Sequence, residues 1–592
     1  MSPHAEQDAA YIAGRIIDCC LRENVRGLFS QGAMAVPPAR VAAAWPNALP
    51  RHWWRIDHLP DGRLWLPVRE DDFMQTIRAL GDGWLLETEG SVTYETGSAC
   101  WMEHLARGMD PETQALHRRY AEEAACAIAH RREARRANAE QREQLALALT
   151  HADWPERALL CERIGSYRDH PFYPTARAKS GFSEVDLRAY APEFAPQFAL
   201  HWLAVPRDQV TLTTPTPAFW PRAAQLGLPA ALDRSHRMLP VHPLTWSSLN
   251  ADDLPAGSQK APLAWLPVRP TLSVRTVMPL AHPHLHIKLP LRMSTLGSLN
   301  LRLIKPSTLY DGHWFEQVLV AVAAIDPALR ERYLHVDEAH GGHVGEARHL
   351  AYLVRRYPIL PESTLVPVAA LCGEMPDGRP LAMHLAARFH AGDPLAWWGE
   401  YTRLLCEVHL RLWLRWGIAL EANQQNAVLV YQPGTPLRLL MKDNDSARVL
   451  PSRLYAQLPG AERFGPLNDA RIVVDSDDAL ARMFCTITLQ LGLLAVLEGV
   501  AEYEPGLRAP MYAALRDILR ACLRQLAGEG IDIAPAERLL ASPRLPVKYL
   551  LSAGSLLSKA ATGAADINKF YGDSAPNFML ADIDAPTARI AG

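Results

Sequence analysis

The sequence predicts a mixed α+β fold with several regions. Residues 109–147 and 477–559 are dense in helix-forming residues, the stretch 169–306 is rich in proline and in short alternating runs, and a hairpin pattern follows at 427–441. Strands that are segregated from helices are typical of α+β proteins, whereas a doubly wound sheet alternates the two. At about 100–200 residues per domain, 592 residues correspond to three or four domains, or two large ones.

The first region, 1–155, is predicted to be mostly helical with a tryptophan-rich interruption. Residues 109–147 consist largely of Ala, Glu, Arg and Leu, which are good helix formers. The basic cluster at 130–136 is also compatible with a nucleic-acid patch. However, charges that repeat along a helix between glutamates usually mark a solvated face, so we expect a long surface helix.

The second region, 156–385, is predicted to be rich in strands. Residues alternate with period two at 271–278 and at 285–289, which is a strand pattern. A helix is expected over 313–335. Short strands and turns are expected over 346–385, where a Pro-Asp-Gly turn occurs.

The third region, 386–592, is predicted to combine a hairpin with helices. The Trp- and Leu-rich pattern at 395–420 indicates a buried helix. Apolar runs at 427–431 and 437–441 flank the turn residues Gln-Pro-Gly-Thr-Pro, which is a hairpin signature. The stretch 477–559 is predicted to be mainly helical.

The composition argues against several classes of protein. Lys and Arg number 61 against 64 Asp and Glu, a net charge of −3, which disfavours a nucleic-acid or membrane-surface partner. The nine cysteines are scattered without a CxxC pair, so neither a disulfide framework nor a structural zinc site is predicted. The longest apolar run that we identify, 318–325, is too short for a membrane span, and acidic residues near the start disfavour a signal peptide. We therefore expect a cytoplasmic protein.

Three oxygen-bearing side chains have a spacing that suits a metal ion. Glu421 and Asn426 lie at the exit of the helix predicted over 395–420, and Asp443 follows the predicted hairpin. Mg²⁺ prefers hard oxygen ligands, and protein kinases likewise use an Asn and an Asp from neighbouring segments. The same residue types also serve as ordinary caps and loop residues, so spacing alone leaves both interpretations open.

A second group of residues suits phosphate or carboxylate oxygens. Alternation places Ser273 and Arg275 on one face of the predicted strand, with Thr276 beside them and Lys288 and Arg302 following. A hydroxyl together with a guanidinium is well suited to bind an oxyanion. Taken alone, a solvent-facing strand with scattered basic residues explains this pattern more readily. The sequence contains no GxxxxGK[ST] or GxGxxG loop, so any bound nucleotide must be held by side chains.

Two further segments carry histidines. Histidines recur at every second position over 282–286, which resembles a metal cluster, but no nearby carboxylate or thiolate completes the site. His170 and Lys179 lie in a proline-stiffened loop over 169–181, which could also be a connection between domains.

In their order along the chain, these motifs resemble the NRPS-independent siderophore synthetases, the aerobactin-synthetase-like IucA/IucC family. The resemblance covers about 160–550. The matching segments are DHPFYPTARAKSGF at 169–182, VHPLT at 241–245, SVRT at 273–276, KPSTLYDG at 305–312, GIALEANQQN at 417–426, KD at 442–443 and LPVK at 545–548.

The resemblance implies a fold and a reaction. The fold would be a cupped hand with a thumb at 1–155, fingers at 156–385 and a palm at 386–592, and the palm would bind ATP in a kinase-like manner. The reaction would adenylate a carboxylate of citrate or 2-oxoglutarate with release of pyrophosphate. An amine or hydroxylamine would then form an amide and release AMP. A homodimer is also expected from the family.

The resemblance further implies roles for individual residues. ATP would be bound by Ser273, Arg275, Thr276, Lys288, Ser298, Gln425 and Lys179. Mg²⁺ would be held by Glu421, Asn426 and Asp443. The acid substrate would contact Arg302, Asn423 and Lys548. The residues closest to the chemistry would be Lys288, Arg302 and His170.

The chain departs from the family pattern at several positions. Asn423 replaces a histidine expected to contact the acid, and an amide can form hydrogen bonds but cannot carry charge. The choice of acid is therefore open. Lys442 replaces an arginine, and Tyr173 replaces a histidine. Two alternatives remain: a binding protein for a polycarboxylate or a ferric siderophore, and a kinase-like phosphotransferase that would produce ADP.

Overall fold

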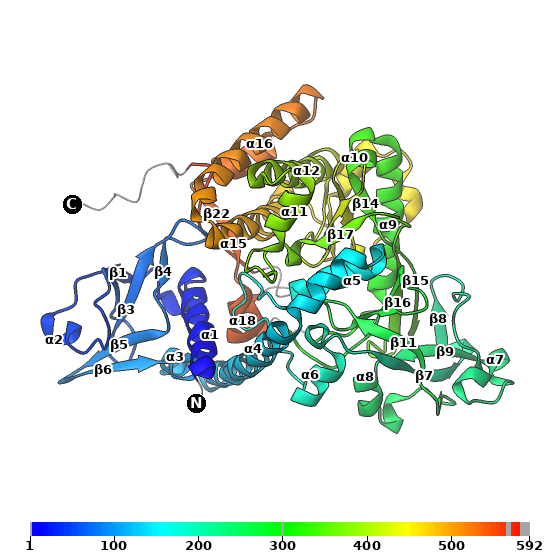
Figure 1. The fold of residues 1–592 in the computed structure, drawn as a ribbon, viewed down its shortest axis with the longest axis horizontal. Coiled ribbons are helices and arrows are strands. Elements are labelled where there is room, and N and C mark those ends of the chain that lie inside the picture. Colours follow the sequence, from blue (N-terminus) through cyan, green and yellow to red (C-terminus); the bar gives the residue numbers. More distant parts are fainter. Residues whose placement is uncertain (1–2, 296, 298–300, 564–569, 581–592) are drawn as a thin grey trace.

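The computed structural model describes residues 3–295, 297, 301–563 and 570–580. Three sheets of four or more strands pack against helices, so the predicted mixture of helices and sheets is confirmed. Among the paired strands that the structure describes, only β14 and β20 run parallel. Figure 1 shows an N-terminal sheet on one side, a second sheet at the opposite lower side and a group of helices above.

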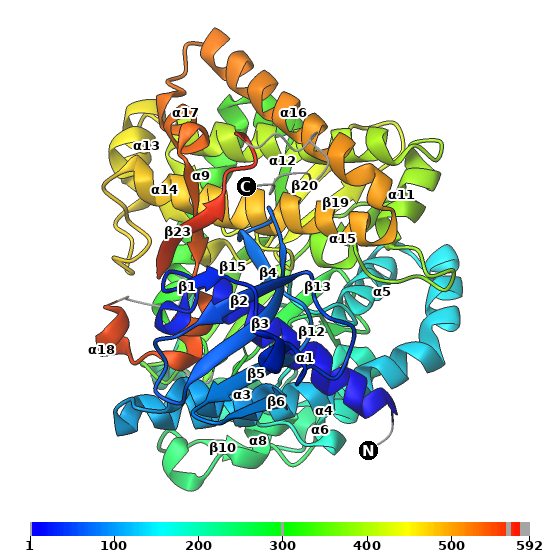
Figure 2. The same cartoon turned by 90° about the vertical axis from the view of Figure 1, so that its left-hand side faces the viewer.

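The N-terminal region is built on a six-stranded antiparallel sheet. Its strands, in spatial order, are β1 (Gly32–Met34), β2 (His52–Ile56), β3 (Arg63–Glu70), β5 (Gly83–Thr88) and β6 (Ser91–Thr96), and β4 (Ile77–Ala79) pairs with β3. Helices α1 (Pro3–Arg22), α3 (Ser98–Ala106) and α4 (Pro111–His151) lie against it. In Figure 2 this sheet and α1 face the viewer.

This sheet occupies the stretch that we predicted only as an interruption of a mostly helical region. Its strands lack a clean alternation because both faces are covered. Trp54 and Leu66 pack with the helices on one face, while Trp53 and Trp65 pack with Val41 on the other. The prediction for this region therefore missed its sheet.

Helix α4 confirms the long helix that we predicted over 109–147. The Asp110 side chain accepts a hydrogen bond from the Thr113 backbone N–H, and Pro111 occupies the first turn, which are both common at helix starts. Its 41 residues correspond to about 60 Å at 1.5 Å per residue. Helix α5 (Trp154–Ser166) follows at once and leads toward the rest of the molecule (Figure 1).

The middle of the chain forms a nine-stranded sheet. Its strands, in spatial order, are β10 (Gln259–Lys260), β7 (Phe198–Pro206), β11 (Trp265–Pro270), β12 (Thr276–Pro279), β13 (Leu285–Lys288), β16 (Ala351–Arg356), β15 (Asp337–Val344) and β8 (Val210–Leu212), and β9 (His236–Val241) pairs with β7. Strand β13 confirms the prediction at 285–289, and Thr276 lies directly opposite Lys288.

The predicted strand at 271–278 is wrong in its first half. The backbone N–H and the hydroxyl of Thr271 both donate to the carbonyl oxygen of Thr276, which closes a tight turn. Val274 within this turn has a φ of 67°. Ser273 and Arg275 therefore lie in a turn before β12 rather than on one face of a strand.

The C-terminal region contains a four-stranded sheet and most of the helices. The strands are β14 (Tyr333–His335), β20 (Arg438–Met441), β19 (Ala427–Tyr431) and β17 (Thr364–Pro367). Two short pairs join β18 (Ile418–Ala419) to β21 (Arg448–Val449) and β22 (Arg544–Lys548) to β23 (Tyr571–Pro576). Its helices include α9 (Ser307–Ile325), α10 (Pro327–Arg332), α11 (Leu381–Phe389), α12 (Pro394–Trp416), α16 (Arg508–Gly528) and α17 (Ala534–Ala541).

Several local predictions for this part are confirmed. The hairpin of β19 and β20 forms as expected, and the helix predicted over 313–335 is present as α9 and α10 up to Arg332, where β14 begins. The region boundary that we predicted at 385 lies inside α11.

Helix α12 forms the centre of the largest core. Asp393 caps its start, and Gly417 ends it with a φ of 67°, a conformation that favours glycine. The tryptophans at 397, 398, 413 and 416 are all buried. The chain thus leaves the core at Gly417 and enters the segment that carries Glu421 and Asn426.

Residues 477–503 form one continuous helical segment. It consists of α14 (Asp477–Met483), a π-helical stretch (Phe484–Leu494) and α15 (Ala495–Tyr503). By length and composition alone it could cross a membrane, but 94% of its most apolar window is buried inside the protein. This apolar segment is longer than 318–325, so our identification of 318–325 as the longest apolar run was wrong.

Candidate active site

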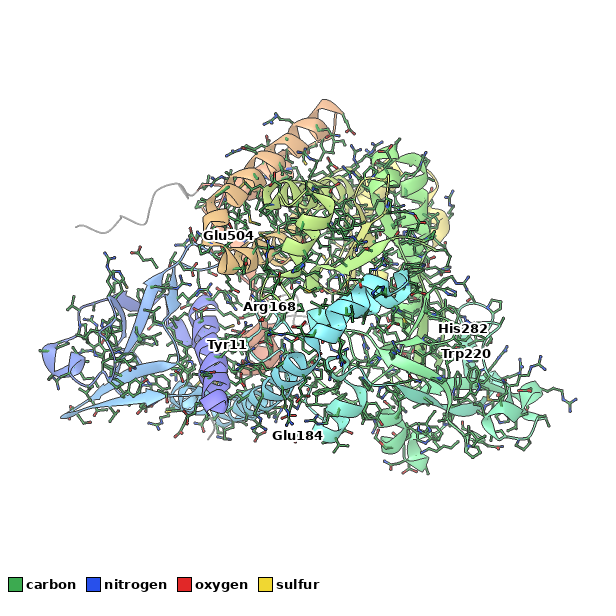
Figure 3. All side chains as sticks on the ribbon, in the orientation of Figure 1. Tyr11, Arg168, Glu184, Trp220, His282 and Glu504 are labelled. Carbon is green, nitrogen blue, oxygen red and sulfur yellow. The ribbon has the colours of Figure 1, made fainter. Side chains whose placement is uncertain are left out.

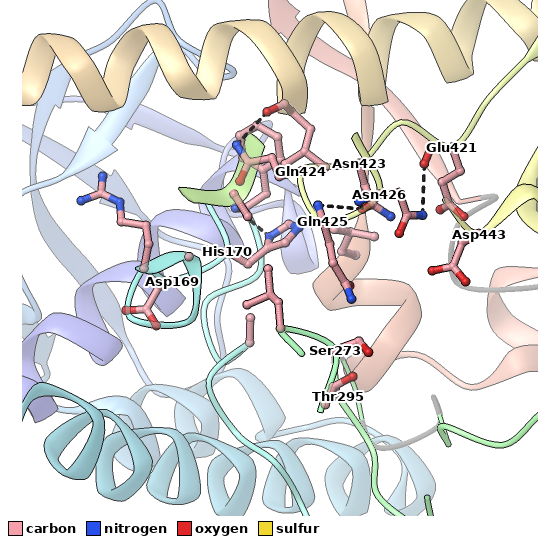
Figure 4. A pocket seen from close by; sticks show the side chains of 18 of the residues that line it. Asp169, His170, Ser273, Thr295, Glu421, Asn423, Gln424, Gln425, Asn426 and Asp443 are labelled. Carbon is pink, nitrogen blue, oxygen red and sulfur yellow. Dashed lines mark hydrogen bonds between the residues drawn. The ribbon is translucent and has the colours of Figure 1, made fainter. Parts of the chain in front are cut away.

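A cavity of about 440 Å³ contains every predicted site residue that the structure describes. Ser298, which we predicted to bind ATP, lies outside the described residues. The predicted residues that line the cavity are His170, Lys179, Ser273, Arg275, Thr276, Lys288, Arg302, Glu421, Asn423, Gln425, Asn426, Asp443 and Lys548. Figure 4 shows Asp443 and Glu421 on one side of the cavity, His170 on the other, and Ser273 with Thr295 below.

The hairpin of β19 and β20 explains why two of the predicted metal ligands lie close together. Ala427 pairs with Met441, and the Lys442 backbone N–H donates to the Asn426 carbonyl oxygen at 3.2 Å. Asn426 and Asp443 therefore flank the same end of the hairpin. The order of residues along the hairpin thus determines the position of this part of the site.

Two buried arginines form a cationic wall. The Arg275 guanidinium donates to the carbonyl oxygens of Arg302 and Leu303, each at 3.2 Å. Burial and the neighbouring Arg275 lower the pKa of Arg302 to about 10, and burial lowers the pKa of Arg275. Among the described residues, neither arginine forms a salt bridge. A bound anion would relieve this unfavourable concentration of positive charge.

Asp443 is held by two cations. Its Oδ1 accepts from Lys288 Nζ at 2.6 Å and from Arg355 Nη2 at 2.8 Å. Burial opposes ionisation of this carboxyl group, but the charges of Lys288 and Arg355 hold its pKa well below the usual range. Arg355 is fixed in turn by Glu338, which accepts from Arg355 Nε at 2.6 Å and from the Asn444 backbone N–H at 2.9 Å. We did not predict Arg355 or Glu338, because neither lies in a recognisable motif.

A second carboxylate lies beside Asp443. Asp445 lines the cavity, and its Oδ1 is 3.9 Å from Lys288 Nζ. Burial and the charge of Asp443 raise its pKa. Asp445 was not predicted, although its place two residues after Asp443 in the sequence is a signal for it.

The oxygen-bearing side chains suit a hard cation such as Mg²⁺. Asn426 Nδ2 donates to the Glu421 carbonyl oxygen at 3.3 Å, which leaves the Asn426 amide oxygen for another partner. Asp443, Asp445 and the Glu421 side chain add carboxylates along the same cavity. A set of carboxylates with one amide oxygen matches the ligands that Mg²⁺ prefers.

Asn423 differs from our expectation. Its Oδ1 accepts from the backbone N–H groups of Gln425 and Asn426, both at 3.0 Å. This oxygen closes the loop that carries the metal-ligand candidates. The amide Nδ2 is therefore the part of the Asn423 side chain that remains for a substrate.

His170 is fixed in its neutral form. Its Nδ1 accepts from the backbone N–H groups of Phe172 and Tyr173, at 3.1 and 3.0 Å, which places the proton on Nε2. Burial, followed by the charges of Arg15 and Arg22, lowers the pKa of His170 to about 3. At neutral pH the ring can donate a hydrogen bond, but it does not carry a transferable positive charge.

The rim of the cavity lies where the N-terminal and C-terminal regions meet. Arg168 donates to Glu502 at 2.6 Å, and Figure 3 shows it beside Tyr11 of α1. Lys179 Nζ donates to Glu193 at 2.6 Å, so its charge is already balanced by a buried carboxylate.

Two other predicted features lie away from the cavity. Lys442, which replaces the family arginine, forms a buried ion pair with Glu162 at 2.5 Å and does not line the cavity. The histidines over 282–286 do not converge: His282 packs against Phe219 and His286 against Tyr357. Within the described residues, they belong to no potential metal cluster.

Comparison with protein families gives two matches. Residues 159–373 match the IucA / IucC family, and residues 395–559 match a family described as ferric iron reductase FhuF-like transporter. The second match covers the predicted metal ligands, Lys548 and the buried helical segment 477–503.

Two curated relatives have low sequence identity to this chain, and both are named as synthases of siderophores. Staphyloferrin B synthase of Staphylococcus aureus is 22% identical over 400 residues, which cover 61% of this chain and 68% of the relative. Aerobactin synthase of Escherichia coli is 27% identical over 318 residues, which cover 46% of this chain and 53% of the relative. These alignments thus span between about half and two thirds of the relatives' lengths.

Solved structures share the fold along the whole chain. The petrobactin biosynthesis protein AsbB from Bacillus anthracis matches with a TM-score of 0.74 and 17% identity, covering 98% of this chain and 96% of that one. ATP-bound aerobactin synthetase IucA from Klebsiella pneumoniae matches with a TM-score of 0.69 and 17% identity, covering 96% and 99%. The match over residues 159–373, the named relatives and the shared fold all show that this chain is similar to the IucA/IucC family, in agreement with the motifs gathered in the cavity.

Proposed function

We propose that this protein is an ATP-dependent siderophore synthetase, an acid–amine ligase that releases AMP and pyrophosphate. It adenylates a carboxylate of citrate or 2-oxoglutarate and joins the acid to an amine or hydroxylamine. The observation that carries this proposal is one cavity that combines a buried arginine pair with a set of oxygen ligands for a cation. Relatives named as synthases and ligases of siderophores support the same reaction class.

In this proposal ATP lies between the middle sheet and the hairpin of β19 and β20. The phosphates contact the turn before β12 and the end of β13, and the hairpin side corresponds to a kinase-like palm. The residues that hold the nucleotide are Ser273, Arg275, Thr276, Lys288, Gln425 and Lys179. The cupped-hand description, with thumb, fingers and palm, is part of the proposal.

Mg²⁺ is proposed to bind to Glu421, Asn426 and Asp443, and Asp445 is close enough to contribute. The ion would supply charge neutralisation for the phosphates. Lys288 now pairs with Asp443, so it can exchange this carboxylate for a phosphate oxygen when the nucleotide binds. This exchange would bring a positive charge to the α-phosphate without moving the backbone.

The acid substrate is proposed to bind next to Arg302 and Lys548. Arg302 is buried beside Arg275, so a polycarboxylate would balance two charges at once. Asn423 contributes its Nδ2 only, because its oxygen closes the loop. In this proposal, the choice between citrate and 2-oxoglutarate therefore depends more on Arg302 and Lys548 than on Asn423.

The reaction then proceeds in two steps. A carboxylate oxygen of the acid attacks the α-phosphorus, and the bond from this phosphorus to pyrophosphate breaks. The amine nitrogen next attacks the acyl carbon, the bond to AMP breaks, and the nitrogen loses a proton. Lys288 and Arg302 offset the charge on the α-phosphate, and neutral His170 donates a hydrogen bond from Nε2. Catalysis of this kind depends on position and charge rather than on a covalent enzyme intermediate.

A homodimer and a cytoplasmic location complete the proposal, since ATP and the small acids are available there. No nucleic acid or membrane partner is part of it.

The test measures pyrophosphate and AMP release by the purified protein with ATP and Mg²⁺. Citrate and 2-oxoglutarate are supplied separately, and hydroxylamine serves as the nucleophile. Release that depends on one of the acids supports the ligase. Production of ADP would instead indicate a phosphotransferase. Tight binding of the acid without any dependence on ATP would indicate a non-catalytic binding protein.

A further inference from the structure

The N-terminal region contains a second cluster of potential metal ligands, away from the cavity. Glu95 at the end of β6 and Cys100 and His104 on α3 bring their ligand atoms within 4.8 Å of one another. Cys100 Sγ donates to Glu95 Oε2 at 3.2 Å, and His104 Nε2 contacts the same oxygen. None of these residues lines the cavity of the active site.

Local structure accounts for this convergence. Cys100 and His104 are four residues apart on α3, so their side chains share one face of the helix. Gly97 connects β6 to α3 with a φ of 91°, a conformation that favours glycine and allows a sharp turn between strand and helix. The turn directs the Glu95 side chain toward the same helix face.

A further carboxylate orients the histidine. His104 Nδ1 lies 2.7 Å from Asp61 Oδ2, and Arg107 holds Asp61 at 2.9 Å. Histidines that bind a metal through one ring nitrogen usually bond a carboxylate through the other. The His104 side chain is only 4% exposed, so its orientation is fixed by these contacts.

The charges of the cluster also suit a cation. The imidazole of His104 lies between the carboxylates of Asp61 and Glu95, and the thiol of Cys100 lies beside Glu95. Two carboxylates and a thiol around one imidazole form a donor set that a divalent cation can bind.

We propose that Glu95, Cys100 and His104 form a zinc site, with Asp61 as the residue that orients His104. A thiolate, an imidazole and a carboxylate are the usual ligands of Zn²⁺, and water completes the tetrahedron. Bond lengths of about 2.0–2.3 Å give distances between ligands of about 3.3–3.8 Å. The 3.2 Å between Cys100 Sγ and Glu95 Oε2 is close to this range of ligand-to-ligand distances. His104 Nε2 lies closer to Glu95 Oε2, so the partly exposed Glu95 side chain would move away from His104 when the ion binds.

The ion would tie three segments together: the end of β6, the start of α3 and the loop between β2 and β3 that carries Asp61. The site is separate from the proposed ligase reaction, and it stands whether or not that reaction is confirmed. Its expected role is to brace the N-terminal region.

The test uses the full-length protein, stripped of metal by a chelator and then titrated with Zn²⁺ and, in parallel, with Co²⁺. We expect one Zn²⁺ per chain to bind at micromolar concentration and Co²⁺ to give a thiolate-to-Co²⁺ charge-transfer band. No cysteine lines the active-site cavity, so an ion bound there cannot give this band. Cys100→Ser and His104→Gln should lose the band and the tightly bound ion, and Asp61→Asn should weaken affinity about 10–100-fold.

Cys126→Ser is a matched control. Cys126 and His130 are also four residues apart on one helix, with Sγ 3.6 Å from the His130 ring, but they belong to no three-ligand cluster among the described residues. This variant should bind Zn²⁺ like the natural protein. Near-UV circular dichroism shows that each variant is folded. The proposal is overturned if the natural protein binds no Zn²⁺ at micromolar concentration, or if folded Cys100→Ser retains the same affinity.

Discussion

Asp443 is the residue on which most of the site's charges converge. It accepts from both Lys288 and Arg355, and it is also a proposed ligand of Mg²⁺. Replacement by alanine removes the metal ligand and leaves two buried cations without their shared partner. We expect Asp443→Ala to lower acid-dependent pyrophosphate release by at least about 100-fold, in the range found when a charge-stabilising group is removed.

The control for Asp443 is Asp377→Asn, which alters a carboxylate in an exposed turn away from the cavity. This variant should retain full activity. Circular dichroism and thermal unfolding show whether each variant is folded. Normal pyrophosphate release by folded Asp443→Ala would contradict the metal assignment.

Arg302 is expected to recognise the acid. Its guanidinium is buried beside Arg275, and the lowered pKa reflects this crowding of positive charge. Arg302→Gln should therefore raise the KM for the acid and lower kcat/KM by about 10- to 100-fold, which corresponds to roughly 1.4–2.7 kcal/mol. Arg292→Gln is the matched control, since Arg292 is half-exposed and paired with Asp253. Equal kinetics for the two variants would argue against a role of Arg302 in acid binding.

Motifs selected residues that the structure brings to one cavity, where the chain itself provides the signal. Glu421, Asn426 and Asp443 were recognised because a helix exit and a hairpin bring them together locally. Arg355 and Glu338 were missed because they approach Asp443 from other strands of the fold. The contact of Asn423 with the acid stays a prediction, and its additional hydrogen bonds to the loop depend on backbone geometry that the sequence does not display.

At the scale of elements, the ion pair of Lys442 and Glu162 joins the end of β20 to α5. Both side chains are buried, and Glu162 also accepts from the Leu272 backbone N–H at 2.8 Å, so the pair supports the turn that carries Ser273. Lys442→Met would leave Glu162 buried without a counter-charge. Breaking such a pair from one side typically costs about 3–5 kcal/mol.

We therefore expect Lys442→Met to lower the midpoint of urea unfolding markedly. Adding Glu162→Gln to this variant should recover much of the loss, because the neutral amide no longer needs a cation and can still accept from Leu272. Equal stability of the single and double variants would show that the uncompensated charge is not the cause.

Helices and strands that depend on a local sequence pattern could be predicted from the sequence. Helices and strands that depend on contacts between distant segments could not. Helices α4 and α12 and the hairpin of β19 and β20 follow from composition, capping and turn residues. The N-terminal sheet was missed because both of its faces are buried, so its strands do not alternate. The turn at 271–275 was missed because the Thr271 hydroxyl competes with a strand ladder.

At the scale of the whole molecule, buried neutral histidines should make the fold sensitive to acid. Burial lowers the pKa to about 3 for His242 and His286, and to about 4 for His409. The unfolded chain binds a proton near pH 6.5, whereas the folded chain does not. Stability should therefore be retained above pH 6.5 and fall below it, by up to about 1.4 kcal/mol per pH unit for each histidine.

His409→Gln tests this pH dependence. Burial alone accounts for the lowered pKa of His409, and its Nε2 is among the buried atoms without a hydrogen-bond partner. When the pH falls from 6.5 to 5.0, the free energy of unfolding should decrease in both proteins, but the decrease in the variant should be smaller by up to about 2 kcal/mol. Urea titration at each pH measures this difference. Parallel losses in both proteins would mean that His409 contributes nothing to the acid sensitivity.

The walls of the cavity come from segments that are far apart in the order of synthesis. His170 is made early, while Lys548, on β22, is made more than half a chain later. At about 5–20 residues per second, a ribosome needs roughly 20–80 s to pass from one to the other. A growing chain therefore cannot complete the site until β22 has been made, and Leu550, Leu551 and Leu556 then also join the core of the N-terminal region. The proposed use of ATP would thus begin only after almost the whole chain has been translated.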